Sequence, residues 1–309
     1  MSGSGSGVEG KPGGMSQPFT VACVQTTSGT EVAANIEAAS ALVRDAAADG
    51  ADFVLLPETG NIMDPSNKRL FEKIAPEEGD ECLKAFRALA QETSIWLLAG
   101  SLVVKDSAPP PEGERAKAVN RSFLIDPEGG ITARYDKIHM FDVDLGDGET
   151  YRESKTYEPG TKAVGADLPW GRLGMTVCYD LRFPRLYRAL AQGGADFLSI
   201  PSAFTRPTGI AHWHVLMRAR AIENGCFVFA PAQCGEHEGG RKTYGHSLII
   251  DPWGEVLADG GFDTGFVSAE IDPAQVTEAR AKIPSLDHDR DFELEISPVP
   301  YPPNGPYPP

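Results

Sequence analysis

One stretch of the chain reads Arg172-Leu-Gly-Met-Thr-Val-Cys178-Tyr-Asp-Leu-Arg-Phe-Pro184. The run from Leu173 to Val177 contains only apolar and small residues before the cysteine, a pattern typical of a short buried strand. The polar residues after Cys178, with Pro184 ahead of an apolar-periodic segment, predict a turn and then a helix. A thiol between a strand and a helix is held rigidly near backbone N–H groups, and a neighbouring base would activate it as a nucleophile. The alternative for Cys178 is a free cysteine packed in the core.

Two other predicted strands also end at chemically useful side chains. The apolar run 52–56 is followed by Pro57 and Glu58, and the strand-like segment 131–137 ends at Lys137. A carboxylate, an ammonium and a thiol suit acyl transfer from an amide, because the carboxylate takes the thiol proton, the thiolate attacks the carbonyl carbon and the ammonium stabilises the oxyanion. Taken singly, Glu58 could cap a loop and Lys137 could be a solvated strand end. Their coincidence with Cys178 favours catalysis.

The segments around Glu58, Lys137 and Cys178, in this order along the chain, resemble the three signatures of the nitrilase (carbon–nitrogen hydrolase) superfamily. The resemblance extends over roughly residues 19–298. A fourth segment, Tyr151-Arg-Glu153-Ser-Lys-Thr-Tyr-Glu-Pro-Gly160, resembles the one that carries the second, positioning glutamate of this family. Glu153 would be that residue.

The second half of the chain resembles the Nit branch of the superfamily. The segments that carry this resemblance are 201–205, 208–213, 218–224, 232–235, 244–247 and 251–254. The branch implies an amidase that hydrolyses the C–N bond of a small, carboxylate-bearing amide through a cysteine thioester, with ammonia release. It favours deaminated glutathione as the substrate over α-ketoglutaramate, and N-carbamoyl amino acids and aliphatic nitriles are further alternatives. The alternative without enzymatic activity is an inactive nitrilase-fold binding module.

The resemblance also implies roles for the individual residues. Glu58 would be the general base for the thiol and later for the attacking water. Lys137 and the backbone N–H of Tyr179 would form the oxyanion hole, and Glu153 would hold Lys137 or the substrate amide in place. The implied partners are a small amide and water, and no cofactor is required.

Substrate recognition requires further residues. Arg182 lies four residues after the predicted nucleophile, and its planar guanidinium suits a substrate carboxylate. The alternative for Arg182 is a salt bridge to Asp180 or Glu153. We expect the loops 141–152 and 234–244 to shape the space beyond the carbonyl. The predicted aromatic walls of the pocket, which could equally belong to the core, are Phe141, Phe204 and Trp213.

Composition limits the classes of partner. The net charge of −16 disfavours nucleic acid and anionic membranes as main partners, because both would be repelled. No apolar run approaches the roughly 20 residues that a membrane span needs.

The cysteines and histidines bear on metals and on the cellular compartment. The five cysteines are an odd number at irregular spacing, and no pair has the CxxC spacing of a structural zinc site. The polar start Met1-Ser-Gly-Ser-Gly is unlike a signal peptide. These observations predict a cytoplasmic protein without structural disulfides. No metal site is expected from the histidines considered for one, which are His212, His214, His237 and His246.

Strands alternate with helices along the chain, which predicts an α/β fold with mixed sheets. The predicted strands are 20–25, 52–56, 95–104, 119–126, 131–137, 173–177, 196–200, 226–232 and 265–271, with a hairpin at 247–257. The predicted helices are 32–48, 80–92, 185–192, 211–224 and 273–281. The resemblance implies a four-layer α-β-β-α sandwich that packs helix layer on helix layer in a homodimer or higher homo-oligomer.

The ends of the chain differ in composition from its middle. The predicted organisation is a flexible extension at 1–17, a single carbon–nitrogen hydrolase domain at 18–298 and a proline-rich tail at 299–309. A proline-rich surface loop is expected at 108–115.

Overall fold

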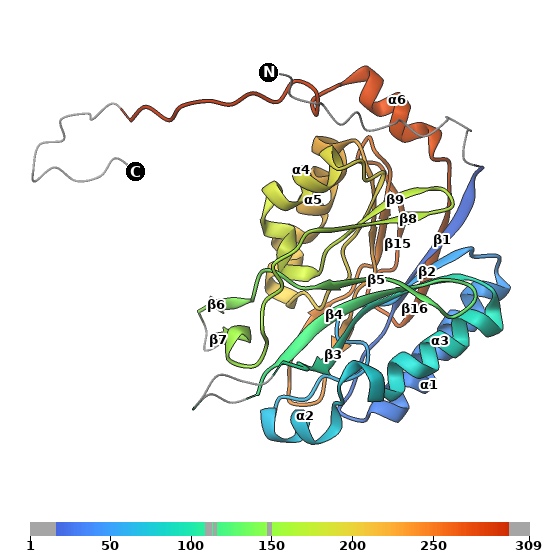
Figure 1. Ribbon diagram of the computed structural model, residues 1–309, viewed down its shortest axis with the longest axis vertical. Coiled ribbons are helices and arrows are strands. Elements are labelled where there is room, and N and C mark those ends of the chain that lie inside the picture. The colour runs from blue at the N-terminus through green and yellow to red at the C-terminus, as the bar shows by residue number, and fades with distance from the viewer. Residues whose placement is uncertain (1–16, 109–112, 114–115, 147–149, 297–309) are drawn as a thin grey trace, which may run out of the picture.

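Two six-stranded sheets form the centre of the molecule in a computed structural model that describes residues 17–108, 113, 116–146 and 150–296 (Figure 1). The predicted extension, apart from residue 17, and the predicted tail lie outside the described residues, as does most of the loop at 108–115.

The first sheet has the strand order β16-β1-β2-β3-β4-β5. Its strands β1, β2 and β3 are parallel, while β16, β4 and β5 join in antiparallel pairs. The bounds are β1 (Phe19–Gln25), β2 (Phe53–Leu55), β3 (Trp96–Lys105), β4 (Ala118–Ile125), β5 (Ile131–Asp136) and β16 (Gly265–Ile271).

The second sheet repeats this arrangement in the order β15-β14-β11-β10-β9-β8. Strands β9, β10 and β11 are parallel, and β8, β14 and β15 join in antiparallel pairs. The bounds are β8 (Val164–Leu168), β9 (Gly171–Met175), β10 (Phe197–Ser199), β11 (Phe227–Ala230), β14 (Leu248–Ile250) and β15 (Val256–Asp259). The mixed sheets predicted from the alternating elements are therefore confirmed.

The inner faces of the two sheets pack on each other. Phe53 of the first sheet meets Phe229 of the second with ring centroids 6.4 Å apart, and both belong to one buried apolar cluster with Tyr135 and Phe197. On the outer face of the first sheet, residues such as Val54 belong to a second cluster shared with the helices. Burial of apolar surface on both faces of each sheet is the main stabilising force of such layers.

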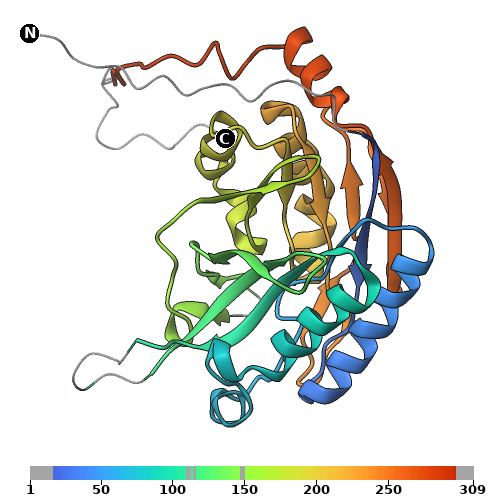
Figure 2. The ribbon, with the colours of Figure 1, turned by 45° about the vertical axis from the view of Figure 1, so that its right-hand side comes forward.

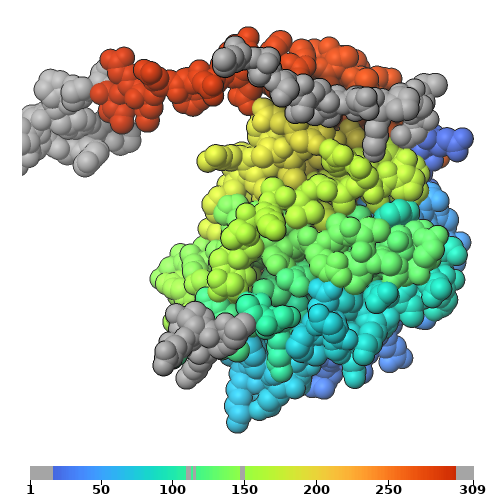
Figure 3. Space-filling model, in the orientation of Figure 1, coloured from blue at the N-terminus to red at the C-terminus, as the bar shows by residue number. Residues whose placement is uncertain are grey.

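Helices cover the two outer faces and complete the predicted four-layer α-β-β-α sandwich (Figure 2). Helices α1 (Val32–Ala48) and α3 (Glu81–Thr93) cover the first sheet, and α4 (Pro184–Gln192) and α5 (Arg206–Asn224) cover the second. On the face in Figure 3, the first half of the chain, in blue to green, lies below the second half, in yellow. The remaining helices are α2 (Asn67–Lys73) and α6 (Ala274–Lys282), and single 3₁₀ turns lie at Glu77–Gly79, Glu153–Lys155 and Cys178–Arg182.

Residues next to the N-termini of α3 and α4 explain where these helices begin. The side chain of Asp80 caps α3 by accepting a hydrogen bond of 2.7 Å from the Leu83 N–H, and Pro184 occupies the first turn of α4. Helix α5 begins at Arg206, earlier than the predicted 211, because a proline is tolerated in the first turn of a helix. Sequence reasoning missed α2, β8 and the short hairpin β6–β7 (Asp142–Asp144, Thr150–Arg152), which lack a long apolar period. A further hairpin, β12–β13 (Cys234–Glu236, Lys242–Tyr244), turns at Gly239 and Gly240, a glycine pair that indicates a hairpin turn in the sequence.

Gly100 in β3 allows the backbone of Leu56, two residues before Glu58, to lie very close to β3. A Cβ atom at this position would lie 1.6 Å from the Leu56 carbonyl oxygen and 2.8 Å from the Pro201 Cβ atom. Only glycine leaves room for this crossing of the two sheets. In the described part of the chain, no helix is both long and apolar enough to cross a bilayer.

Candidate active site

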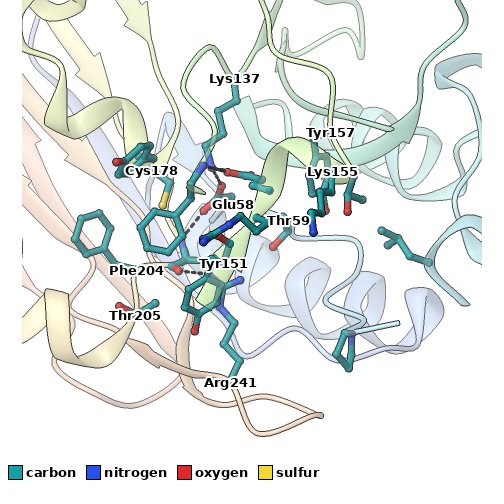
Figure 4. A pocket seen from close by; sticks show the side chains of 18 of the residues that line it. Glu58, Thr59, Lys137, Tyr151, Lys155, Tyr157, Cys178, Phe204, Thr205 and Arg241 are labelled. Atoms are coloured by element: carbon teal, nitrogen blue, oxygen red, sulfur yellow. Dashed lines mark hydrogen bonds and ion pairs between the residues drawn. The ribbon is translucent and has the colours of Figure 1, made fainter. Parts of the chain in front are cut away.

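Three strand ends meet at one cavity of about 400 Å³ (Figure 4). Glu58 follows β2, Lys137 follows β5, and Cys178 follows β9 at the start of a 3₁₀ turn. All three side chains line the cavity, together with Glu153 and Tyr179. The packing of the two sheets therefore brings together residues that are far apart in the sequence.

The backbone is strained at two of these strand ends. Cys178 has a φ of 48°, and Thr59, which follows Glu58, has a φ of 52°. Left-handed backbone is uncommon for residues other than glycine and costs about 1–3 kcal/mol where it occurs. The N–H of Cys178 donates to the Pro201 carbonyl at 2.9 Å and holds this conformation.

Lys137 is the centre of a buried ion cluster. Its Nζ lies 2.9 Å from Glu58 Oε1 and 2.9 and 2.8 Å from the two oxygens of Glu153. Burial alone would lower the pKa of Lys137, but the two carboxylates raise it well above its usual value. Burial alone would raise the pKa of Glu58, but the Lys137 ammonium lowers it below the usual value. Ionised Glu58 and charged Lys137 are therefore the resting forms.

Cys178 keeps its proton in this environment. Burial raises the pKa of its thiol above the ordinary value, and the Glu58 carboxylate raises it further, while Lys137 acts in the opposite direction. The thiol is therefore neutral at rest, and a base must take its proton as the sulfur attacks. All five cysteines are buried and free, and Cys178 alone among them lines the cavity.

Both oxygens of Glu58 and both oxygens of Glu153 accept hydrogen bonds from additional donors, the longest being 3.5 Å from the Asn120 amide to Glu153 Oε1. The side-chain amide of Asn120 donates to Glu58 Oε1 at 3.0 Å, and the Ala203 N–H donates to Glu58 Oε2 at 2.8 Å. The Phe141 N–H donates to Glu153 Oε2 at 2.6 Å. Sequence reasoning missed Asn120, because it is followed in β4 by two further polar residues, Arg121 and Ser122, and nothing local distinguishes it from them.

A donor pair for an oxyanion is present beside the thiol. The backbone N–H of Tyr179 has no hydrogen-bond partner in the described part of the chain, whereas the neighbouring N–H groups of Cys178 and Asp180 are both used. With Lys137 Nζ it can stabilise negative charge on a carbonyl oxygen attacked by Cys178.

Two of the three aromatic residues predicted to wall the pocket lie at the cavity. Phe141 and Phe204 line the cavity. Trp213 does not, because it is fully buried behind Phe204, with ring centroids 5.1 Å apart, and its indole N–H donates to the His246 carbonyl at 2.8 Å. The prediction for Trp213 is therefore wrong.

Arg182 lies outside the cavity wall. Its guanidinium carbon lies 5.4 Å from the centroid of the Phe204 ring, and Nη2 lies 3.3 Å from His212 Nδ1. The residue is absent from the cavity lining, so the geometry does not support its predicted contact with a substrate carboxylate. The alternative salt bridge is not formed either, because Asp180 instead binds His139 and the hydroxyl of Tyr135.

The two loops that were expected to shape the far end of the pocket do contribute to it. The described residues of the loop 141–152 contribute Thr150, Tyr151 and Arg152, and the loop 234–244 contributes Arg241. Lys155 adds a further cation from the 3₁₀ turn Glu153–Lys155. None of these residues was singled out from the sequence.

The histidines do not meet at the catalytic cavity. His214, His246 and Asp259 place potential ligand atoms within 4.8 Å of one another, but hydrogen bonds of 2.7 and 3.1 Å from the two imidazoles to the carboxylate account for this cluster. His237 lies elsewhere, bound to Ser28 and Thr243.

Comparison with known proteins places this fold and cavity in a family. Residues 20–281 match the family described as carbon–nitrogen hydrolase. A deaminated glutathione amidase from Synechocystis is 43% identical over 274 residues, which are 88% of this chain and 98% of that protein.

Two further relatives agree with this result. The human ω-amidase NIT2 is 35% identical over 86% of this chain and 93% of its own length. The crystal structure of Nit3 from Saccharomyces cerevisiae, described as a member of branch 10 of the nitrilase superfamily, has a TM-score of 0.76 at 29% identity and covers 87% of this chain and 96% of that chain.

Proposed function

The chain belongs to the carbon–nitrogen hydrolase family and is an amidase, and from this premise we propose that Cys178, Glu58 and Lys137 perform the hydrolysis while Glu153 positions the lysine. The observation that supports this assignment most directly is the Lys137 ammonium between the carboxylates of Glu58 and Glu153, in one cavity with Cys178.

The first half of the reaction forms a thioester. Sγ of Cys178 attacks the amide carbon while its proton passes to Glu58, and the carbonyl oxygen becomes an oxyanion held by Lys137 and the Tyr179 N–H. The C–N bond then breaks as Glu58 returns this proton to the leaving nitrogen. The products are a free amine or ammonia and an acyl-Cys178 thioester.

The second half hydrolyses the thioester. Glu58, again a carboxylate, takes a proton from water as the oxygen attacks the acyl carbon, and the same oxyanion site holds the tetrahedral intermediate. The C–S bond breaks, the thiolate recovers its proton from Glu58, and the acid is released. Glu153 acts through Lys137 because it binds the ammonium with both oxygens.

The favoured substrate is deaminated glutathione, and α-ketoglutaramate is the second candidate. Glutathione is γ-glutamyl-cysteinyl-glycine, so its deaminated form and α-ketoglutaramate share one acyl group and would form the same thioester on Cys178. Their leaving groups differ, since the first releases the amine of cysteinylglycine and only the second releases ammonia. The ammonia release that the resemblance implied therefore applies to α-ketoglutaramate and not to deaminated glutathione. The 43% identical deaminated glutathione amidase supports the first candidate, and the ω-amidase relative supports the second.

A comparison of kcat/KM tests this proposal, with release of 2-oxoglutarate, the product common to both substrates, as the readout. We expect deaminated glutathione to exceed α-ketoglutaramate by about tenfold or more, because its dipeptide makes further contacts with the cavity. Equal or higher values for α-ketoglutaramate would assign ω-amidase activity instead. Preference for neutral aliphatic amides, nitriles or N-carbamoyl amino acids would contradict both candidates.

We also propose a cytoplasmic homodimer. The free cysteines support a reducing compartment. An apolar patch made of Val215, Ile222 and Trp253 supports the dimer, since these side chains are 68%, 52% and 56% exposed. The Arg218 side chain connects α5 to the turn that carries Trp253 by donating a hydrogen bond of 2.7 Å to the Gly254 carbonyl. Such patches on the outer helix layer commonly mark protein–protein contacts.

A charge in this patch tests the dimer. Val215→Glu is expected to shift the protein from dimer to monomer in sedimentation velocity, because burying an unpaired carboxylate in an interface is costly. Ala41→Glu places the same charge on the exposed side of α1 and is the matched control, which should leave the dimer intact. A monomeric parent protein, or an unchanged Val215→Glu variant, would contradict this interface.

A further inference from the structure

Arg241 is a cavity residue with a fixed backbone. It precedes β13, and its carbonyl accepts a hydrogen bond of 2.8 Å from the His237 N–H. The His237 side chain anchors the same loop, with contacts of 2.9 Å to the Ser28 carbonyl and 2.7 Å to the Thr243 hydroxyl. Figure 4 shows the Arg241 side chain reaching from this loop into the cavity beside Tyr151.

The guanidinium of Arg241 is only partly satisfied. Nη2 donates to the Ala203 carbonyl at 2.7 Å, but Nε is buried and has no hydrogen-bond partner among the described residues. In the same part of the chain, no carboxylate lies within ion-pair distance of this guanidinium. Arg121 shows the contrast, since it is paired with both Glu77 and Asp136. A half-buried cation without a counter-ion is costly unless an anion binds there.

A second unpartnered group lies at the same cavity. The hydroxyl oxygen of Thr59 is buried without a hydrogen-bond partner in the described structure, and both Thr59 and Arg241 line the catalytic cavity and an adjoining cavity of about 130 Å³. The Arg241 guanidinium carbon lies 5.4 Å from the centroid of the Tyr151 ring, a cation–π contact that restrains its plane. Oriented donors of this kind suit a carboxylate.

The position of Arg241 is close to the reacting groups. The Ala203 carbonyl accepts its hydrogen bond, while the N–H of the same residue donates to Glu58 Oε2. Burial raises the pKa of Glu58, and Lys137, the hydrogen bond with Cys178 and, to a smaller extent, the positive charge of Arg241 lower it. Arg241 and the general base Glu58 are thus linked through one residue, Ala203. The carboxylate of the 2-oxo acyl group is separated from the scissile amide carbon by fewer bonds than the dipeptide carboxylate of deaminated glutathione, so it is the nearer anion to the reacting groups.

We propose that Arg241, assisted by the Thr59 hydroxyl, binds the carboxylate of the 2-oxo acyl group of the substrate. This inference rests on the proposed function. It predicts that the enzyme recognises the acyl part that deaminated glutathione and α-ketoglutaramate share, and that Arg241 selects acidic over neutral acyl groups.

Kinetics of Arg241 variants test the assignment. Arg241→Ala is expected to lower kcat/KM about 10- to 100-fold for both acidic substrates, mainly through KM, because hydrogen bonds between the charged guanidinium and the carboxylate are lost. Slow turnover of neutral pentanamide should change much less. Arg241→Lys should recover only part of the loss, since lysine keeps the charge without the planar fork.

Binding of 2-oxoglutarate gives a second measurement that does not depend on turnover. Calorimetry should show weaker binding by Arg241→Lys than by the parent protein, which remains informative if the alanine variant does not fold. Arg182→Ala is the matched comparison, because it removes the neighbouring guanidinium that does not line the cavity. A loss with Arg182→Ala and none with Arg241→Ala would overturn the proposal.

The remaining outcomes separate this inference from the proposed function. Loss confined to deaminated glutathione would place Arg241 at the leaving group and overturn its role at the acyl carboxylate. If the parent enzyme prefers acidic substrates and both Arg241 variants keep that preference, the inference alone fails. If the parent enzyme prefers neutral amides, the proposed function fails, and the inference with it.

Discussion

Replacement of Cys178 by serine is expected to lower kcat about a thousand-fold or more while the fold is retained. A hydroxyl is a far weaker acid than a thiol, and Glu58, whose pKa is lowered by Lys137, is too weak a base to activate it. The oxygen atom is smaller than sulfur, so the cavity accommodates it. Turnover of deaminated glutathione and the thermal melting temperature measure the two effects.

The control for this variant is a second buried cysteine. Cys82 lies on α3 in the outer apolar cluster, so Cys82→Ala should keep its kcat even if its melting temperature falls. Mass spectrometry of the parent enzyme during slow turnover should locate the acyl adduct on Cys178. The other cysteines are Cys23, Cys82, Cys226 and Cys234, and an adduct on any of them would contradict the assignment.

Glu58→Gln is expected to lower kcat about 100- to 10,000-fold, the usual range for loss of a general acid–base. One carboxylate serves both the formation and the hydrolysis of the thioester, so single-turnover measurements should show both steps slowed. Lys137 would keep Glu153 as its counter-ion, so the variant should fold. Normal thioester formation with slow hydrolysis would assign the thiol proton to another base.

The pH dependence follows from the direction of the Glu58 pKa. This pKa is lowered from its ordinary value of 4.5, so the carboxylate stays ionised in the folded enzyme as the pH falls to that value. The acidic limb of kcat/KM should therefore lie below 4.5. The ion pair contributes stability above the unfolded-state pKa and loses it as the pH falls through the lower folded-state pKa. An acidic limb above 4.5 would contradict an ionised Glu58 at rest.

Local sequence patterns were sufficient for the α/β class with mixed sheets and for the elements that carry the reacting groups, whereas the four-layer arrangement was implied by the family resemblance. Helix α1 and strand β16 have the predicted bounds, because their apolar residues follow a clear period and breakers flank them. The placement of Glu58, Lys137 and Cys178 at strand ends was also visible, since an apolar run that stops at a polar residue marks such an end. Short elements such as α2 were missed because a single turn or two carries too little periodicity.

The sequence by itself determined the strand ends and the chemistry available there, whereas only the tertiary structure decided which arginine lines the cavity. Arg182 is near Cys178 in sequence, but a 3₁₀ helix has about three residues per turn, so a side chain four positions after Cys178 points about a third of a turn away from it. Arg241 comes from a distant hairpin, and bridges from Thr26 to Gln233 and from Thr205 to Thr243 hold this part of the chain where Arg241 lines the same cavity as Glu58. Local periodicity sets which face of an element is buried, but the packing of distant elements sets which side chains share a cavity.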